Sequence, residues 1–161
     1  MNFGLSLGSA AVSALLGRQI VSQAITDASC SIYSSIGDVF HHTHSIDKVL
    51  FTLDINNKIK TMELLCNSLT SKGSDSSNES AINFCLDNLH DMIIRIREDL
   101  KQLKTLIDYH KSKWFNSMRS LDVRTQLTNL KLHTQLLDSR YELFVKTITV
   151  YNMLDNKDEV R

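Results

Sequence analysis

Two long stretches of the sequence place apolar residues at alternating intervals of four and three. A mean spacing of 3.5 residues keeps one face of a helix against a partner helix over many turns. The pattern therefore predicts two helices, over 79–114 and 120–154, each about 50 Å long. The first ladder consists of Ile82, Leu86, Leu89, Ile93, Ile96, Leu100, Leu103, Ile107, His110 and Trp114. The second consists of Val123, Leu127, Leu130, Thr134, Leu137, Tyr141, Phe144, Ile148 and Tyr151.

The first half of the chain predicts two further helices. Over 9–36 the residues are mostly small or apolar, and a face of small residues would let a neighbouring helix approach closely. Over 46–70 an apolar stripe runs from Phe51 to Leu69, with Ser45 as the expected N-cap and Asp47 as an acidic residue in the first turn. The small residues of the first helix are Ala10, Ala14, Gly17, Val21 and Ala28.

The connections between these helices favour an antiparallel arrangement. A five-residue link between the last two helices forces the chain to turn back, and the polar, serine-rich stretch 71–79 predicts a flexible loop. The chain has 161 residues, 42% of them hydrophobic, and no proline, which suits one helical domain of ordinary size. We expect an all-α fold over residues 1–161: an up-down-up-down antiparallel four-helix bundle with two long C-terminal helices.

Candidate surfaces lie at opposite ends of the expected bundle. Residues 1–17 form an apolar segment rich in Gly, Ala and Ser, which predicts a docking element for a protein partner or a membrane. The turn at His41, His42 and His44 should approach a basic end of the molecule, which is the candidate anion-binding site. The expected docking residues are Gly4, Leu5, Leu7, Gly8, Val12, Leu15 and Leu16; the expected anion-binding residues are Lys111, Lys113, Arg119 and Arg124.

Composition and spacing give no support for catalysis, metal binding or nucleic-acid binding. No nucleophile stands beside an oriented base, and the three turn histidines lack a cysteine or carboxylate at ligand spacing. The formal net charge is zero, whereas nucleic-acid binders generally carry excess basic charge. We expect a protein that is not an enzyme, that has no cofactor, and that does not bind nucleic acid.

The opening Phe3-Gly-Leu-Ser-Leu-Gly-Ser-Ala-Ala-Val-Ser-Ala-Leu-Leu16, followed by amphipathic helices, resembles the HeLo and HeLo-like bundles of fungal cell-death proteins. The resemblance implies that the N-terminal segment inserts into membranes, with Gly4, Gly8 and Leu15–Leu16 in that role. The chain departs from the family pattern because it lacks a regulatory or prion-forming extension. Minor capsid or scaffolding proteins of large DNA viruses can have a similar outline, although no motif identifies one.

These observations together predict a structural or assembly protein that acts through protein–protein surfaces, for example as a minor component of a virion. The alternative is a bundle that associates with or perturbs membranes through its apolar N-terminal helix. The segment before Arg18 lacks a basic start and is diluted by serines, so we expect no secretion signal. The three cysteines are odd in number and suit reduced thiols, so we expect an intracellular protein.

Overall fold

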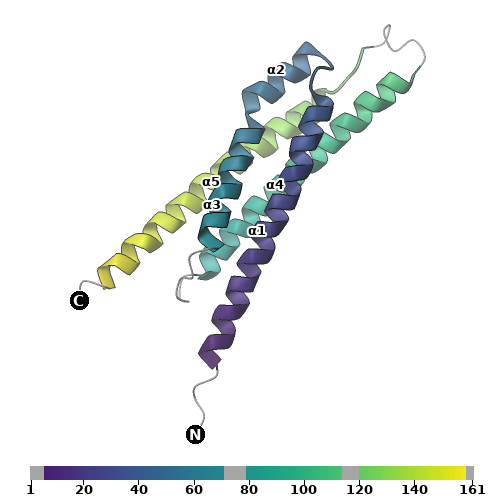
Figure 1. Ribbon diagram of the computed structural model, residues 1–161. Coiled ribbons are helices and arrows are strands. Elements are labelled where there is room, and N and C mark those ends of the chain that lie inside the picture. Colours follow the sequence, from purple (N-terminus) through teal and green to yellow (C-terminus); the bar gives the residue numbers. More distant parts are fainter. Residues whose placement is uncertain (1–5, 71–78, 114–119, 159–161) are drawn as a thin grey trace.

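The computed structural model describes residues 6–70, 79–113 and 120–158, and within them the side chains of 17–69, 80–113, 120–151 and 153. Throughout these ranges the regular structure is helical, and the helices pack against one another (Figure 1). The helices are α1 (Ser6–Val39), α2 (His44–Leu53), α3 (Ile55–Thr70), α4 (Glu79–Ser112) and α5 (Arg124–Asp158). The prediction of an all-α fold is confirmed.

Helix α4 lies at the centre of the packing. Its most extensive contacts are with α1 and α5, while α3 packs against α1 and α2 contacts α5. The ladder predicted for α4 is buried from Leu86 to Ile107, with Ile82 and His110 partly exposed at its ends. The second ladder is buried from Val123, which immediately precedes α5, to Leu137 and again at Phe144. The apolar periodicity therefore identified the core correctly; Trp114 lies outside the described residues.

Helix α1 buries part of the small-residue face that the sequence predicted: Ala28 is buried and Val21 packs against the core, while the side chains of Ala10 and Ala14 lie outside the described set. Gly17 is exposed, and a Cβ added to it would meet no atom within 4 Å, so the small-residue face does not produce a close helix approach there. The buried positions again follow intervals of four and three, but three of them are polar. They are Arg18, Ser22, Ile25, Ser29, Ile32, Ile36 and Val39, and Ala28 is buried beside them. Because these polar residues interrupt the apolar pattern, the ladder is not evident from apolar periodicity in the sequence.

The single helix predicted over 46–70 is two helices. Asp54 adopts the left-handed conformation, with φ 48° and ψ 40°, and ends α2 immediately before Ile55 begins α3. Its backbone N–H donates to the Leu50 carbonyl at 3.3 Å, and its side chain accepts from Asn57 at 2.7 Å. Aspartate tolerates this conformation better than most residues because its short side chain bonds locally. The chain thereby changes direction without a glycine or proline.

Two predicted helix starts are also wrong. The N-cap of α2 is Thr43, whose hydroxyl accepts from the Ile46 N–H at 3.3 Å, so Ser45 already lies inside the helix. Helix α5 begins at Arg124 instead of Ser120, and the Asp122 carboxylate accepts from the Arg124 N–H at 3.3 Å. In both cases several capping residues stand close together, and local sequence does not decide between them.

Candidate functional site

The predicted N-terminal docking segment forms the start of α1. Leu7, Gly8, Val12 and the Leu15–Leu16 pair belong to the helical backbone, although their side chains lie outside the described set, and Gly4 and Leu5 precede the described residues. Figure 1 shows the first turns of α1 extending past the beginning of α4 and the end of α3. The sequence assigned this segment its apolar character, and the fold positions its backbone at one end of the molecule.

Two polar contacts determine how α1 is aligned along α4. Arg18 Nε donates to Asn83 Oδ1 at 3.2 Å, and Lys104 Nζ donates to Asp38 Oδ2 at 2.5 Å. The two pairs are separated by 65 and 66 positions, so α1 and α4 run in the same direction with a constant offset. The first residue of α4 therefore lies level with about residue 14 of α1, and roughly 12 Å of helix precedes that level.

A second contact joins α1 to α3 near the same end. The Ser22 hydroxyl donates to Asn67 Oδ1 at 2.7 Å, and Ser22 is itself buried. Beside this pair lies an open groove of about 690 Å³, lined by polar residues that include Gln19, Gln23 and Asp27 as well as exposed Ile20. Arg18 and Ser22 were not predicted from the sequence as contact residues, because their partners are more than forty residues away along the chain.

The basic end brings together the α1–α2 turn and the last turns of α4. His42 Nε2 lies 2.9 Å from the Asp38 carbonyl oxygen and 3.2 Å from Lys111 Nζ. Because one imidazole nitrogen either donates or accepts, a neutral His42 satisfies one of these contacts at a time. The hydrogen bond and negative charge of Asp38 raise the pKa of Lys104 above its ordinary value. The expected approach of the turn to Lys111 is present for His42.

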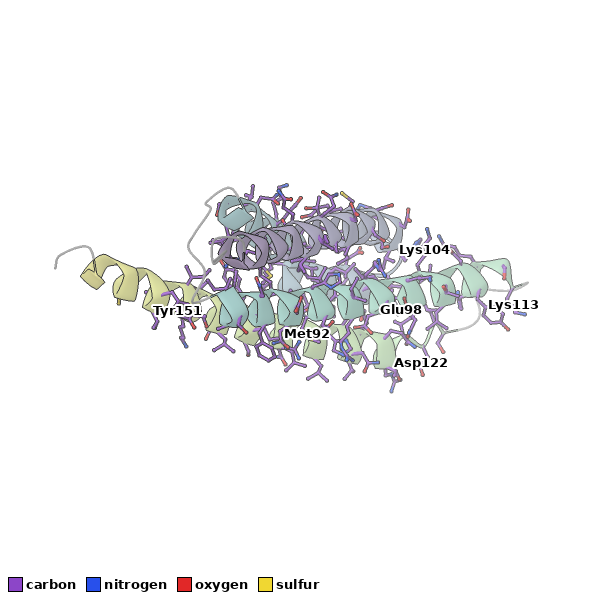
Figure 2. The ribbon with its side chains drawn as sticks, turned by 90° about the horizontal axis from the view of Figure 1, so that it is seen from below. Met92, Glu98, Lys104, Lys113, Asp122 and Tyr151 are labelled. Atoms are coloured by element: carbon purple, nitrogen blue, oxygen red, sulfur yellow. The ribbon has the colours of Figure 1, made fainter. Side chains whose placement is uncertain are left out.

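Three of the four predicted anion-binding cations, Lys111, Lys113 and Arg124, belong to the described residues. Lys113 Nζ lies 4.4 Å from the centre of the Tyr109 ring, and Arg124 Nε lies 3.8 Å from the Asp122 carboxylate. In Figure 2 Lys113 and Asp122 lie at the same end of the molecule. Arg119 lies outside the described residues. Anion binding at this end stays a prediction, and the contacts show that Lys111, Lys113 and Arg124 each have a neighbour within the chain.

Two partly buried ionisable contacts join helices in the middle of the molecule. His133 Nδ1 lies 2.6 Å from Asp99 Oδ2, between α5 and α4, and both side chains are largely buried. Tyr33 on α1 donates to Glu63 on α3 at 3.4 Å; burial, and then the negative charge of Glu63, raise the pKa of Tyr33 to about 12. Among the described residues no three His, Cys, Asp or Glu side chains are placed to hold a metal ion.

The outer side of α5 carries an apolar stripe that sequence analysis did not identify. Leu132, Leu143, Val150 and Met153 are 50%, 53%, 54% and 62% exposed, and Leu136 is exposed as well. We call these five residues the α5 stripe. With Ser139 and Lys146 they follow intervals of four and three, so a second helical seam was present in the sequence but was interrupted by two polar residues. In Figure 2 α5 runs along one edge of the molecule, and its last turns, beyond Tyr151, extend past the beginning of α4.

Comparison with known proteins gives one distant relationship. The chain is 25% identical over 148 aligned positions to an uncharacterized protein of Acanthamoeba polyphaga mimivirus, and the alignment covers 76% of this chain and 72% of that protein. No family model matches the chain, and no solved structure matches it. In the part of the chain that the structure describes, no helix is long and apolar enough to cross a bilayer.

Proposed function

We propose that this protein is a non-enzymatic component of a larger protein assembly, built as an up-down-up-down antiparallel four-helix bundle that contacts other subunits through its helix surfaces. The observation that carries the proposal is the position of α1, whose start precedes the level of Glu79 at the beginning of α4. That part of α1 has an apolar sequence. When a partner covers an apolar helix end of this kind, the free energy of the system falls.

The contacts between helices support the up-down order. Helices α1 and α4 run in the same direction, as their two polar pairs indicate. Cys85 lies 3.7 Å from Thr147, and Asp99 lies 2.6 Å from His133. Since later residues of α4 contact earlier residues of α5, the two helices are antiparallel. The α2–α3 segment runs back from the end of α1. On α3, Lys58 forms an ion pair with Asp138 of α5 at 2.7 Å. These four directions alternate along the chain.

The buried polar groups support a structural role over a catalytic one. Arg18, Ser22 and Asp99 each bond to a residue on another helix, and such bonds hold the helices in register. Their atoms are therefore engaged in packing. We propose that the functional groups of this protein are its surfaces, and that no substrate pocket is used.

The relative in a mimivirus supports a viral setting for the assembly, such as a minor component of a virion inside the infected cell. That relative is itself uncharacterized, so the partner subunits are proposed by chemistry alone. They should present an apolar groove or helix face that accepts Leu7, Val12, Leu15 and Leu16.

The alternative function is membrane association by a HeLo-like bundle, which the same apolar segment favours. In that case residues 1–17 would insert into lipid, and Gly4 and Gly8 would permit close approach between neighbouring helices. Both functions use one segment, but they differ in whether the protein needs a second protein or a lipid surface.

A point substitution in the full-length chain separates these functions. Leu15→Lys places a charge in the apolar segment, and Gln19→Lys adds the same charge at an exposed position one turn later. Under the assembly proposal, wild-type protein and Gln19→Lys capture the same partner subunit from native material, and each then binds that subunit after it has been purified. Leu15→Lys does neither. Circular dichroism should show equal helicity for all three proteins.

Vesicle flotation provides the opposing result. If wild-type protein floats with vesicles of phosphatidylcholine and phosphatidylserine, and Leu15→Lys remains in the dense fraction, membrane association replaces assembly as the function. If Leu15→Lys unfolds the protein, the segment belongs to the core and neither docking function is correct.

A further inference from the structure

We infer that the α5 stripe is the contact surface for a second copy of this chain, in a two-fold dimer whose α5 helices run antiparallel. The stripe lies on α5, away from the N-terminal segment assigned to docking above, so the inference goes beyond the proposed function and does not depend on it. The occupant is argued from the area, charge and polar pattern of the stripe.

The stripe has the dimensions of a helix–helix interface. From Leu132 to Met153 it covers about 33 Å of helix. Two such helices packed along their stripes would bury on the order of 1,000 Å² in total, near the lower bound for a specific interface. Its members are exposed although they recur with the spacing of a packing seam. An exposed seam of this length indicates a helical partner.

Charge favours a second copy as that partner. The formal net charge of the chain is zero, so two copies experience no net repulsion as they approach. Within the seam, the charged side chain is Lys146, whose Nζ lies 3.7 Å from Glu142 Oε2 on the same helix. An interface formed by this surface therefore contains almost no unbalanced charge.

The position of Lys146 selects the antiparallel orientation. In a parallel pair each seam residue faces its own copy, so two Lys146 ammonium groups would meet between the helices at a free-energy cost. In an antiparallel pair centred between Ser139 and Lys146, each lysine faces an apolar residue or the small Ser139 of the other copy. Its methylene stem can then cover that surface while the ammonium reaches water.

The test is the mass of the full-length protein in solution, measured by light scattering after size-exclusion chromatography. At about 100 µM wild-type protein should have the mass of two chains, because micromolar affinity suffices at that concentration. Leu143→Lys should weaken the dimer by at least about 100-fold, since symmetry introduces the substitution twice. Thr128→Lys adds the same charge on an exposed position of α5 beyond the stripe and should leave the dimer intact.

Orientation is tested with a spin label at Thr128→Cys in a Cys30→Ser background, because Cys30 is exposed while Cys66 and Cys85 are buried. The two labels should lie about 45 Å apart in the antiparallel dimer and about 10–20 Å apart in a parallel one. A short distance would overturn the proposed orientation.

Three other results would overturn the inference. These are a monomeric wild-type protein, an unchanged dimer in Leu143→Lys, and a monomer that binds phosphatidylcholine–phosphatidylserine vesicles only when the stripe is intact. Val150→Lys serves as the second variant if Leu143→Lys is unfolded by circular dichroism. Leu15→Lys should keep the mass of two chains, so a failure of the N-terminal docking function is distinguishable from a failure of the dimer.

Discussion

Leu100→Ala is the most direct test of the core around α4. Leu100 has no exposed surface, and it lies on the helix that contacts both α1 and α5. Truncation removes three carbon atoms from a site enclosed by other helices, where backbone collapse is restricted. Large-to-small changes of this kind cost about 2–5 kcal/mol, as lost apolar burial adds to the cavity that remains. We expect about 3 kcal/mol, because neighbours on two sides limit relaxation of the cavity.

Urea titration of the full-length protein measures this loss as a lower midpoint at unchanged slope. For a chain of this length, 3 kcal/mol corresponds to a fall in Tm of about 6–12 °C. The control is Leu64→Ala on α3, whose side chain is 58% exposed. It should cost less than about 1 kcal/mol, since little apolar surface is lost and alanine favours helix. A loss below about 0.5 kcal/mol for Leu100→Ala would refute the central position of α4.

Burial raises the pKa of Cys66 to about 12, so its thiol should react with iodoacetamide at pH 8 only after unfolding, whereas exposed Cys30 reacts in the native protein; mass spectrometry of the alkylated peptides checks this. Since Cys66 and Tyr33 have raised pKa values, their protonated forms are favoured by folding, and the free energy of unfolding should decrease as pH rises from about 9 to 12. Ultraviolet titration of Glu63→Gln should show Tyr33 ionising at lower pH than in wild type, and an unchanged curve would contradict their contact. At Asp54, thermal unfolding should find Ala less stable than Gly by about 1 kcal/mol, because only glycine occupies the left-handed conformation without strain.

The two apolar ladders allowed a correct prediction of the helical class and of most core positions in α4 and α5. Hydrophobic periodicity is a local property, and burial of a continuous apolar face lowers the free energy whichever partner covers it. Residues such as Leu100 and Leu130 were therefore assignable without knowledge of the other helices. The apolar character of residues 1–17 was equally evident from sequence, and its role remains a proposal.

The sequence by itself determined which faces of α4 and α5 are apolar enough to require burial, and that requirement is enough to specify an all-helical domain. The tertiary structure decided what depends on distant partners. Arg18 and Ser22 are buried because Asn83 and Asn67 bond to them, and such bonds compensate the desolvation that otherwise keeps polar groups at the surface. The α5 stripe is exposed because the other helices occupy the opposite face of α5, although both faces carry the same spacing. Periodicity identifies surfaces that can pack, and only the arrangement of all helices determines which of them remain open to a partner.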